Sequence, residues 1–200
     1  MRILYTGFSP FGGESINPSF EALKLLPEKI AGAEVVIREI PTEFGRGPEA
    51  VLKAVKELSP DAVICVGQAG GRASVTPEYI GINCRNARIP DNAGQKPEFE
   101  RIRPEGPDGI FSRLPVALIA EKCREKGIPA AVSYSAGTYV CNDVLYTLLY
   151  ETDPGLPAGF IHVPYACSQT AAQPNPAASL PLETIAEALR IAGETVLEML

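Results

Sequence analysis

The chain has 200 residues, 46% of them hydrophobic, and a formal net charge of −6, which suits one globular domain over residues 1–200 with a large core. The acidic balance, without any Lys/Arg cluster, excludes a nucleic-acid-binding face and argues against an anionic membrane surface. The N-terminal apolar run is too short for a signal peptide and no stretch is long enough to span a bilayer, so we expect a cytoplasmic protein without a membrane segment.

The first third of the chain alternates strand and helix patterns. Residues 3–7 predict a short apolar strand, and a helix should follow with Asn17 as its N-cap and Pro18 at its first position. Further strands are predicted at residues 35–40 and 62–67, separated by a helix whose apolar positions recur up to Leu58. This order is β-α-β-α-β.

Residues 68–109 interrupt this alternation. They contain Gly-Gly, a Thr-Pro-Glu, a short predicted strand at residues 79–83 and a polar stretch rich in Pro, Arg and Asp. About 40 residues without a helix pattern indicate a functional excursion or a subunit contact.

The alternation then resumes to the end of the chain. Helices are predicted at residues 116–126, from about 140 to 150 and from residue 182, with strands at 130–133 and 160–163. Strands separated by helices predict an α/β fold with a largely parallel sheet covered on both faces.

The single histidine, His162, lies in an apolar run predicted to be a buried strand, and it is the only candidate for acid–base chemistry by imidazole. Cys141 precedes it at a predicted helix start, where free amide groups and the helix dipole favour the thiolate and can face an oxyanion. A thiol with an imidazole on the next strand is typical of a nucleophile and its base. Asp143 should oppose thiolate formation, so we expect His162 to supply most of the activation.

The other cysteines give no metal or disulfide pattern. The five cysteines are an odd number without a C-x-x-C pair, which fits neither a disulfide framework nor a zinc site. Cys65 and Cys123 lie in predicted core elements, and no role is assigned to Cys84 or Cys167. Residues 45–50 match G-x-G-x-x-A, but they follow the second strand and lack the acidic partner of a dinucleotide site.

Five sequence blocks carry a family resemblance. They are TGFSPFGG with Asn-Pro (residues 6–18), VGQAGGR leading to TPE (66–78), ARIPDN (87–92), SAGTYVCN (135–142) and FIHVP (160–164). Together they resemble the type I pyroglutamyl peptidases, or pyrrolidone-carboxylate peptidases. The resemblance implies a cysteine exopeptidase (omega-peptidase) that hydrolyses the amide bond after an N-terminal pyroglutamyl residue through a thioacyl-enzyme, without metal or cofactor.

The resemblance also implies a phosphorylase/hydrolase-like three-layer α/β/α sandwich with a mixed, largely parallel sheet, and a homo-oligomer that is usually a tetramer. In the implied triad Cys141 is the nucleophile, His162 the general base and then acid, and Glu78 the carboxylate that orients the imidazole. The implied substrate-binding residues are Gln68 and Arg88 beside the scissile carbonyl, Phe8 and Phe11 around the lactam ring, and Asn17 and Val140 as further contributors to the pocket.

Several points stay open at this level. Asp91 is a rival to Glu78, because both lie in the irregular excursion. Asp143 stands where similar proteins commonly have histidine, and residues 165–170 keep little of the usual pattern. A glutaminase-like amidohydrolase with a Cys/His/acid triad and a catalytically silent relative that binds a small molecule are the alternative functions.

Overall fold

The computed structural model describes all residues from 1 to 200 and is built around a six-stranded sheet of order β2-β3-β1-β4-β8-β5. The four inner strands are parallel, and the edge strands β2 and β5 are antiparallel to their neighbours. The strands are β1 (Arg2–Phe8), β2 (Lys29–Ile30), β3 (Ala33–Ile40), β4 (Ala62–Gln68), β5 (Thr76–Pro77) and β8 (Ala158–Val163). The predicted mixed, largely parallel sheet is confirmed.

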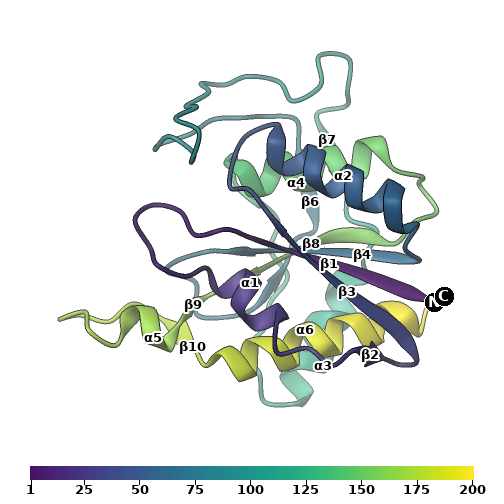
Figure 1. Ribbon diagram of the computed structural model, residues 1–200, viewed down its shortest axis with the longest axis vertical. Helices are drawn as coiled ribbons and strands as arrows, with labels where there is room; N and C mark the ends of the chain where they lie inside the picture. Colours follow the sequence, from purple (N-terminus) through teal and green to yellow (C-terminus); the bar gives the residue numbers. More distant parts are fainter.

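Helices cover both faces of this sheet, which confirms the three-layer α/β/α arrangement (Figure 1). One face carries α1 (Pro18–Leu23), α3 (Val116–Glu125) and α6 (Leu182–Leu197), and the other carries α2 (Arg46–Leu58) and α4 (Val140–Glu151). Side chains alternate along each strand: in β1, Ile3 and Tyr5 join the core shared with α6, and Leu4 and Phe8 join the core shared with α4.

The predicted strand at residues 130–133 is wrong. Ala130 and Ser133 form only isolated bridges, to Val75 and Glu78 respectively. Their partner strand β5 has two residues and includes Pro77, which has no N–H for a continuous ladder, so the pairing at this sheet edge is interrupted.

The excursion contains a small antiparallel pair, β6 (Ile80–Ile82) and β7 (Gly109–Phe111). It includes the predicted strand at residues 79–83 in shortened form. Between the two strands the chain is irregular and is held by side-chain contacts such as those of Asn83, whose Nδ2 donates to the carbonyl oxygens of Arg103 and Gly106. Six short elements were not predicted: β2, β5, β7, β9 (Tyr165–Ala166), α5 (Cys167–Thr170) and β10 (Ser179–Leu180).

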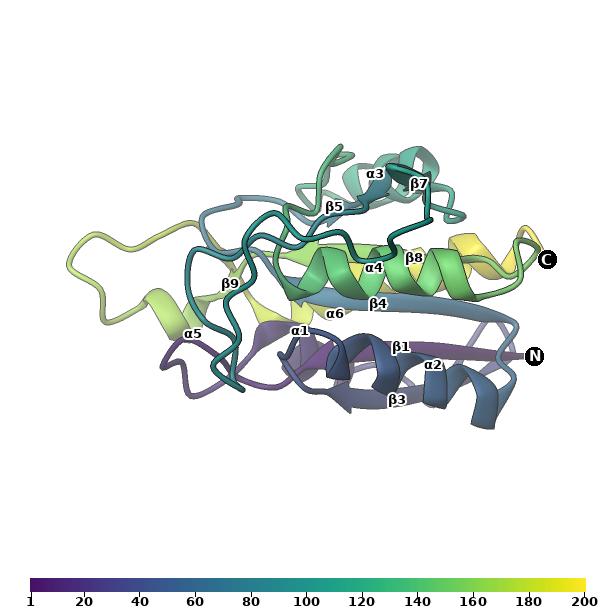
Figure 2. The same ribbon diagram turned by 90° about the horizontal axis from the view of Figure 1, so that it is seen from above.

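The loops that follow β1, β4 and β8 gather at the end of the sheet away from both termini (Figure 2). Open parallel α/β sheets bind ligands at the carboxyl ends of their strands. Among the helices, none combines the length and the apolar character needed to cross a membrane.

Candidate active site

The single imidazole meets a buried carboxylate near the carboxyl end of β8. His162 is 4% exposed, and its Nδ1 lies 2.7 Å from Oε1 of Glu78, which is fully buried. The backbone holds this pair in place, because β5 pairs with β8 and the Glu78 N–H donates to the Phe160 carbonyl at 2.9 Å. Since Nδ1–H donates to Glu78, the imidazole keeps Nε2 as its free acceptor.

The rival carboxylate has a different environment. Asp91 Oδ2 accepts the Phe44 N–H at 2.8 Å, and Oδ1 accepts the N–H groups of Ala93 and Gln95 at 2.9 and 2.7 Å. Asp91 therefore fixes the backbone of the excursion and makes no hydrogen bond to His162. Of the two candidates, the structure brings only Glu78 to the imidazole.

Cys141 is the second residue of α4, whose N-cap Tyr139 provides no side-chain cap. The N–H groups of Val140 and Cys141 have no hydrogen-bond partner within the protein, so they are free at the helix start. The thiol lies against β4: a Cβ atom added to Gly67 would come within 2.9 Å of Cys141 Sγ. Gly67 is paired with His162 in the sheet register, which places the thiol beside the imidazole.

Cys141 and His162 line one cavity of about 300 Å³ and are not hydrogen-bonded to each other. Catalytic hydrogen bonds are often long in unliganded enzymes and tighten with substrate. The same cavity is lined by Phe11 and Gln68, two of the residues that the resemblance implied for substrate binding. No carboxylate side chain contributes to its wall.

The thiolate expected at the helix start is not favoured in the free protein. Burial and the charge of Glu78 raise the pKa of Cys141 to about 12, against the opposing effects of Arg72 and of the Cys141 N–H. Burial also holds the pKa of His162 below its usual range, although Glu78 raises it. Desolvation outweighs the helix-start amides, so the free protein carries a neutral thiol beside a neutral imidazole near neutral pH.

Asp143 also differs from expectation. Its buried carboxylate accepts from Arg85 Nη2 at 2.8 Å and from the Gly45 N–H at 2.9 Å. The groups whose charges act on the Cys141 thiol are Glu78, Arg72 and Cys65, and Asp143 is not among them. Asp143 therefore joins the start of α4 to the start of α2 and to the excursion, and the expected opposition to the thiolate is not found.

The remaining implied residues surround the cavity at different depths. Arg88 lines a neighbouring hollow of about 450 Å³ that shares Phe11 with the cavity. Phe8 is 2% exposed and packs against Phe160, with ring centroids 6.2 Å apart, so it belongs to the core beneath the site. Val140 is fully buried and does not line the cavity, and its backbone N–H is free at the start of α4.

Asn17 acts on a loop of the site rather than in the cavity. Its Oδ1 accepts from the N–H and Oγ of Ser19, which caps α1, and its Nδ2 donates to the Ser9 carbonyl at 3.1 Å. Ser9 lies two residues before Phe11 in the same loop. Asn17 therefore fixes the start of the loop that carries Phe11.

Arg72 and Gln169 contact residues implied for the site and received no role from the sequence. Arg72 lines the cavity, and its Nη1 lies 2.7 Å from Glu78 Oε1. Gln169 donates through Nε2 to Gln68 Oε1 and to Glu14 Oε2, both at 3.1 Å. Arg72 belongs to the quoted block at residues 66–72, which was the available signal, whereas Gln169 lies in the segment that keeps little of the family pattern.

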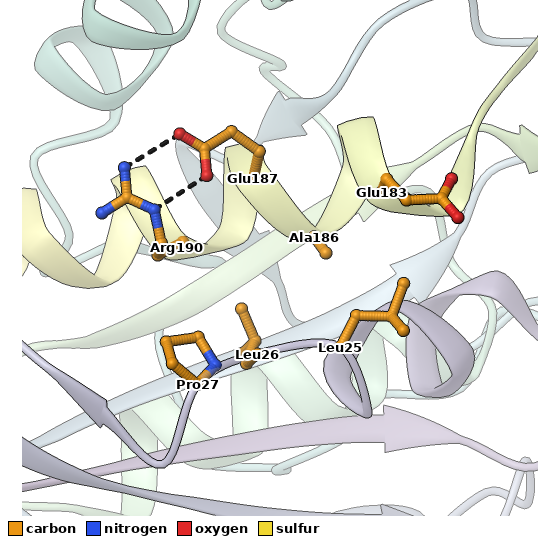
Figure 3. Close-up of a pocket in the computed structure, with 7 residues that line it drawn as sticks. All are labelled: Leu25, Leu26, Pro27, Glu183, Ala186, Glu187 and Arg190. Atoms are coloured by element: carbon orange, nitrogen blue, oxygen red, sulfur yellow. Dashed lines mark hydrogen bonds and ion pairs between the residues drawn. The ribbon is translucent and has the colours of Figure 1, made fainter.

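A second hollow lies between α6 and the segment that follows α1 (Figure 3). Its one cation, Arg190, is bound to Glu187 by two contacts of 2.8 Å. The wall contains no cysteine or histidine. This hollow therefore lacks the thiol and the imidazole that the sequence analysis singled out, and the cavity at Cys141 is the candidate active site.

Comparisons with known proteins identify the family to which the chain is similar. The family model "Pyroglutamyl peptidase" matches residues 1–199. Pyrrolidone-carboxylate peptidases of Enterococcus faecalis and Bacillus licheniformis are each 49% identical, over 94% and 96% of this chain and 90% of their own lengths. A crystal structure of pyroglutamyl peptidase I from Bacillus amyloliquefaciens is 44% identical with a TM-score of 0.93, covering 98% of this chain and 97% of that one. The pyrrolidone carboxyl peptidase of Thermococcus litoralis is 37% identical with a TM-score of 0.94, covering 98% and 93%.

Proposed function

The chain belongs to the pyroglutamyl peptidase family, and we propose that it carries out the family's hydrolysis with Cys141 as nucleophile, His162 as base and Glu78 as the orienting carboxylate. It is a cysteine peptidase that removes an N-terminal pyroglutamyl residue from peptides. The observation that supports these roles most strongly is the 2.7 Å contact of buried Glu78 with His162, whose imidazole lines the same cavity as the Cys141 thiol.

In the proposed mechanism, His162 Nε2 accepts the thiol proton as Cys141 Sγ attacks the carbonyl carbon of the pyroglutamyl residue. The free N–H groups of Val140 and Cys141 face the oxyanion that forms. The imidazolium, stabilised by Glu78, gives its proton to the leaving amine, and the C–N bond breaks to leave a thioacyl-enzyme. His162 then takes a proton from water, and the resulting hydroxide attacks the thioester carbonyl carbon. The C–S bond breaks, the imidazolium returns its proton to the Cys141 sulfur, and pyroglutamate is released.

Substrate recognition uses the wall of the same cavity. Phe11 supplies an apolar surface for the lactam ring, and Gln68, held by Gln169, supplies a polar group beside the scissile carbonyl. Arg88 lies in the adjoining hollow, where the peptide beyond the scissile bond extends. A mostly apolar pocket with a few convergent polar groups is typical of small-molecule recognition.

A fluorogenic pyroglutamyl coumarin amide tests the proposal. We expect turnover by the wild-type protein and none after alkylation with iodoacetamide or in the Cys141→Ala variant. Release of ammonia from glutamine without cleavage of the pyroglutamyl amide would support a glutaminase-like enzyme. Binding of the amide without turnover would support a catalytically silent relative, and turnover by Cys141→Ala would refute the nucleophile.

We further propose that residues 1–200 act as one catalytic domain in the cytoplasm, as a homotetramer. An active thiol is best kept in a reducing compartment, and all five cysteines of the structure are unpaired. The rings of Tyr79, Phe111 and Tyr134 are exposed next to one another, which supplies an apolar surface for a second copy. Cell fractionation and light scattering of the purified protein test these two points, and an extracellular or monomeric active enzyme would contradict them.

A further inference from the structure

Arg72 shares an oxygen atom with the catalytic histidine. Its Nη1 lies 2.7 Å from Glu78 Oε1, and His162 Nδ1 lies 2.7 Å from the same atom. The second Glu78 oxygen, Oε2, is buried without a hydrogen-bond partner. The nearby Ser133 hydroxyl, which also lowers the pKa of Glu78, donates to the Ser135 carbonyl. The contacts of Arg72 and His162 with this carboxylate therefore converge on one oxygen.

Arg72 also connects the chain segments that carry the triad. Its Nη1 contacts Thr76 Oγ1 at 2.5 Å, and its Nη2 donates to the Ser135 carbonyl at 3.2 Å. Thr76 is paired with His162 across β5 and β8, and Ser135 lies in the loop that leads into α4. One guanidinium thus joins the loop after β4, the strand before Glu78 and the loop before Cys141.

Resting on the proposed function, we propose that Arg72 is a positioning residue that holds Glu78 against His162 and keeps the imidazole unprotonated in the free enzyme. A buried carboxylate with histidine as its only partner draws a proton onto the ring, and a protonated ring is unable to act as a base. A cation on the same oxygen offsets this attraction. Glu78 then orients the imidazole without converting it into imidazolium before substrate arrives.

The groups around the imidazole have opposite effects on its protonation. Glu78 approaches from the end of β5, Arg72 from the loop after β4, and the neutral Cys141 thiol from α4. Burial and the charge of Arg72 lower the pKa of His162, and Glu78 raises it. Removing the cation therefore has to raise the pKa of His162.

The single histidine allows a direct test. The imidazole proton resonances of His162 can be followed by NMR as a function of pH in the wild-type protein, Arg72→Gln and Arg72→Lys, with Arg72→Met as a second uncharged variant if the first does not fold. We expect the uncharged variants to titrate about one pH unit or more above the wild type, and Arg72→Lys to stay close to it. Arg190→Gln, which removes an arginine paired with Glu187 on α6, is the matched control and should titrate as the wild type does.

The kinetic arm uses the pyroglutamyl coumarin amide. In Arg72→Gln, the acidic limb of the kcat/KM profile should move to higher pH by the same amount as the NMR titration of His162. The value of kcat at neutral pH should fall about tenfold or more. Arg72→Lys should restore most of this loss. An unchanged or lowered His162 titration, or a loss confined to KM, would overturn the proposal. If the NMR shift occurs in a protein that does not cleave the amide, the proposed function fails and the role of Arg72 in setting the charge of His162 stands.

Discussion

At the scale of single residues, the proposed mechanism gives three groups unequal tasks. In this proposal Cys141 forms and breaks the covalent bond, His162 moves the proton, and Glu78 fixes the ring and stabilises its charged form. The first two take part in every chemical step, whereas the third acts through His162 Nδ1. Substitution of these three residues should therefore lower kcat/KM to different extents.

We predict that Cys141→Ala and His162→Ala each lower kcat/KM by about 10⁴-fold or more, and that Glu78→Gln retains roughly ten- to a hundredfold more activity than either. Steady-state kinetics with the pyroglutamyl coumarin amide measures all three. Equal losses in all three variants would mean that Glu78 does more than orient the imidazole.

Asp91 is the matched carboxylate control for Glu78. Its two oxygens accept three backbone N–H groups, and an asparagine side chain offers only one acceptor oxygen. Asp91→Asn should therefore lower the free energy of unfolding by about 1–3 kcal/mol, while kcat changes less than about tenfold at a temperature where the fold persists. A larger loss of kcat than in Glu78→Gln would favour Asp91 over Glu78 as the carboxylate on which catalysis depends.

The protonation of His162 predicts a pH dependence with a definite sign. Burial lowers the pKa of His162 in the folded protein, so the unfolded chain binds a proton first as the pH falls below about 6.5. The free energy of unfolding should therefore fall from about pH 6.5 down to the folded pKa, and kcat/KM should decrease through that folded value. Thermal melts and kinetics between pH 5 and pH 8 measure both.

His162→Gln is the control for this pH dependence, because glutamine does not titrate. The decrease in stability that begins near pH 6.5 should be reduced in this variant. An acidic limb of kcat/KM above about pH 6.5 in the wild-type enzyme would show that Glu78 outweighs burial and Arg72 at the imidazole.

At the scale of elements, the position of the thiol depends on how closely α4 approaches β4. A Cβ atom at Gly67 would lie 2.9 Å from Cys141 Sγ and 2.7 Å from Phe160 Cζ. A glycine at this point of β4 lets the start of the helix descend onto the sheet, next to the strand that carries His162. The absence of a side chain at Gly67 therefore allows the thiol to lie close to β4.

We predict that Gly67→Ala lowers kcat/KM by about a hundredfold, since a displacement of the nucleophile near 1 Å has a cost of that size. Gly81→Ala is the matched control: its Cβ would meet Leu145 and the Tyr146 backbone at 3.1 Å, farther along the same helix. The control should lose thermal stability but keep kcat/KM within about tenfold. Equal kinetic losses in both variants would indicate a general disturbance of α4 rather than a displaced thiol.

Regular elements could be predicted from the sequence because their patterns are local. The Asn17 cap, the buried strands β4 and β8 and the start of α4 each follow from neighbouring residues, and all are present in the structure. The chemical role of Cys141 and His162 also has a local signal, namely a thiol at a helix start and the only imidazole on the next strand.

The contacts that complete the site have no local signal. Glu78 meets His162 across 84 residues, and Asp143 meets Arg85 across 58. Glu78 follows a two-residue strand containing Pro77, where neither strand nor helix periodicity applies. The pKa of Cys141 was misjudged for a related reason, because the helix start is visible in the sequence and the degree of desolvation is not.

At the scale of the whole molecule, the cavity is assembled from segments spread along the entire chain. Phe11 follows β1, Gln68 ends β4, Arg72 lies in the next loop, and Cys141 and His162 come from α4 and β8. The charged side chains that face a substrate in this cavity are therefore brought together only by the complete fold. The wall contains the guanidinium of Arg72 and no carboxylate.

This charge distribution predicts a strong preference for pyroglutamyl over prolyl amides. The two rings have nearly the same shape, so apolar contact with Phe11 gives only about 1–3 kcal/mol of discrimination. Pyroglutamate presents a neutral N–H and a carbonyl, whereas proline presents an ammonium group that would be buried without a counter-charge and near Arg72. The unpaired partner of the missing lactam carbonyl adds to this cost, so kcat/KM should differ by about ten-thousandfold or more. Matched coumarin amides measure the ratio, and a value within about tenfold of unity would mean that the cavity does not recognise the lactam.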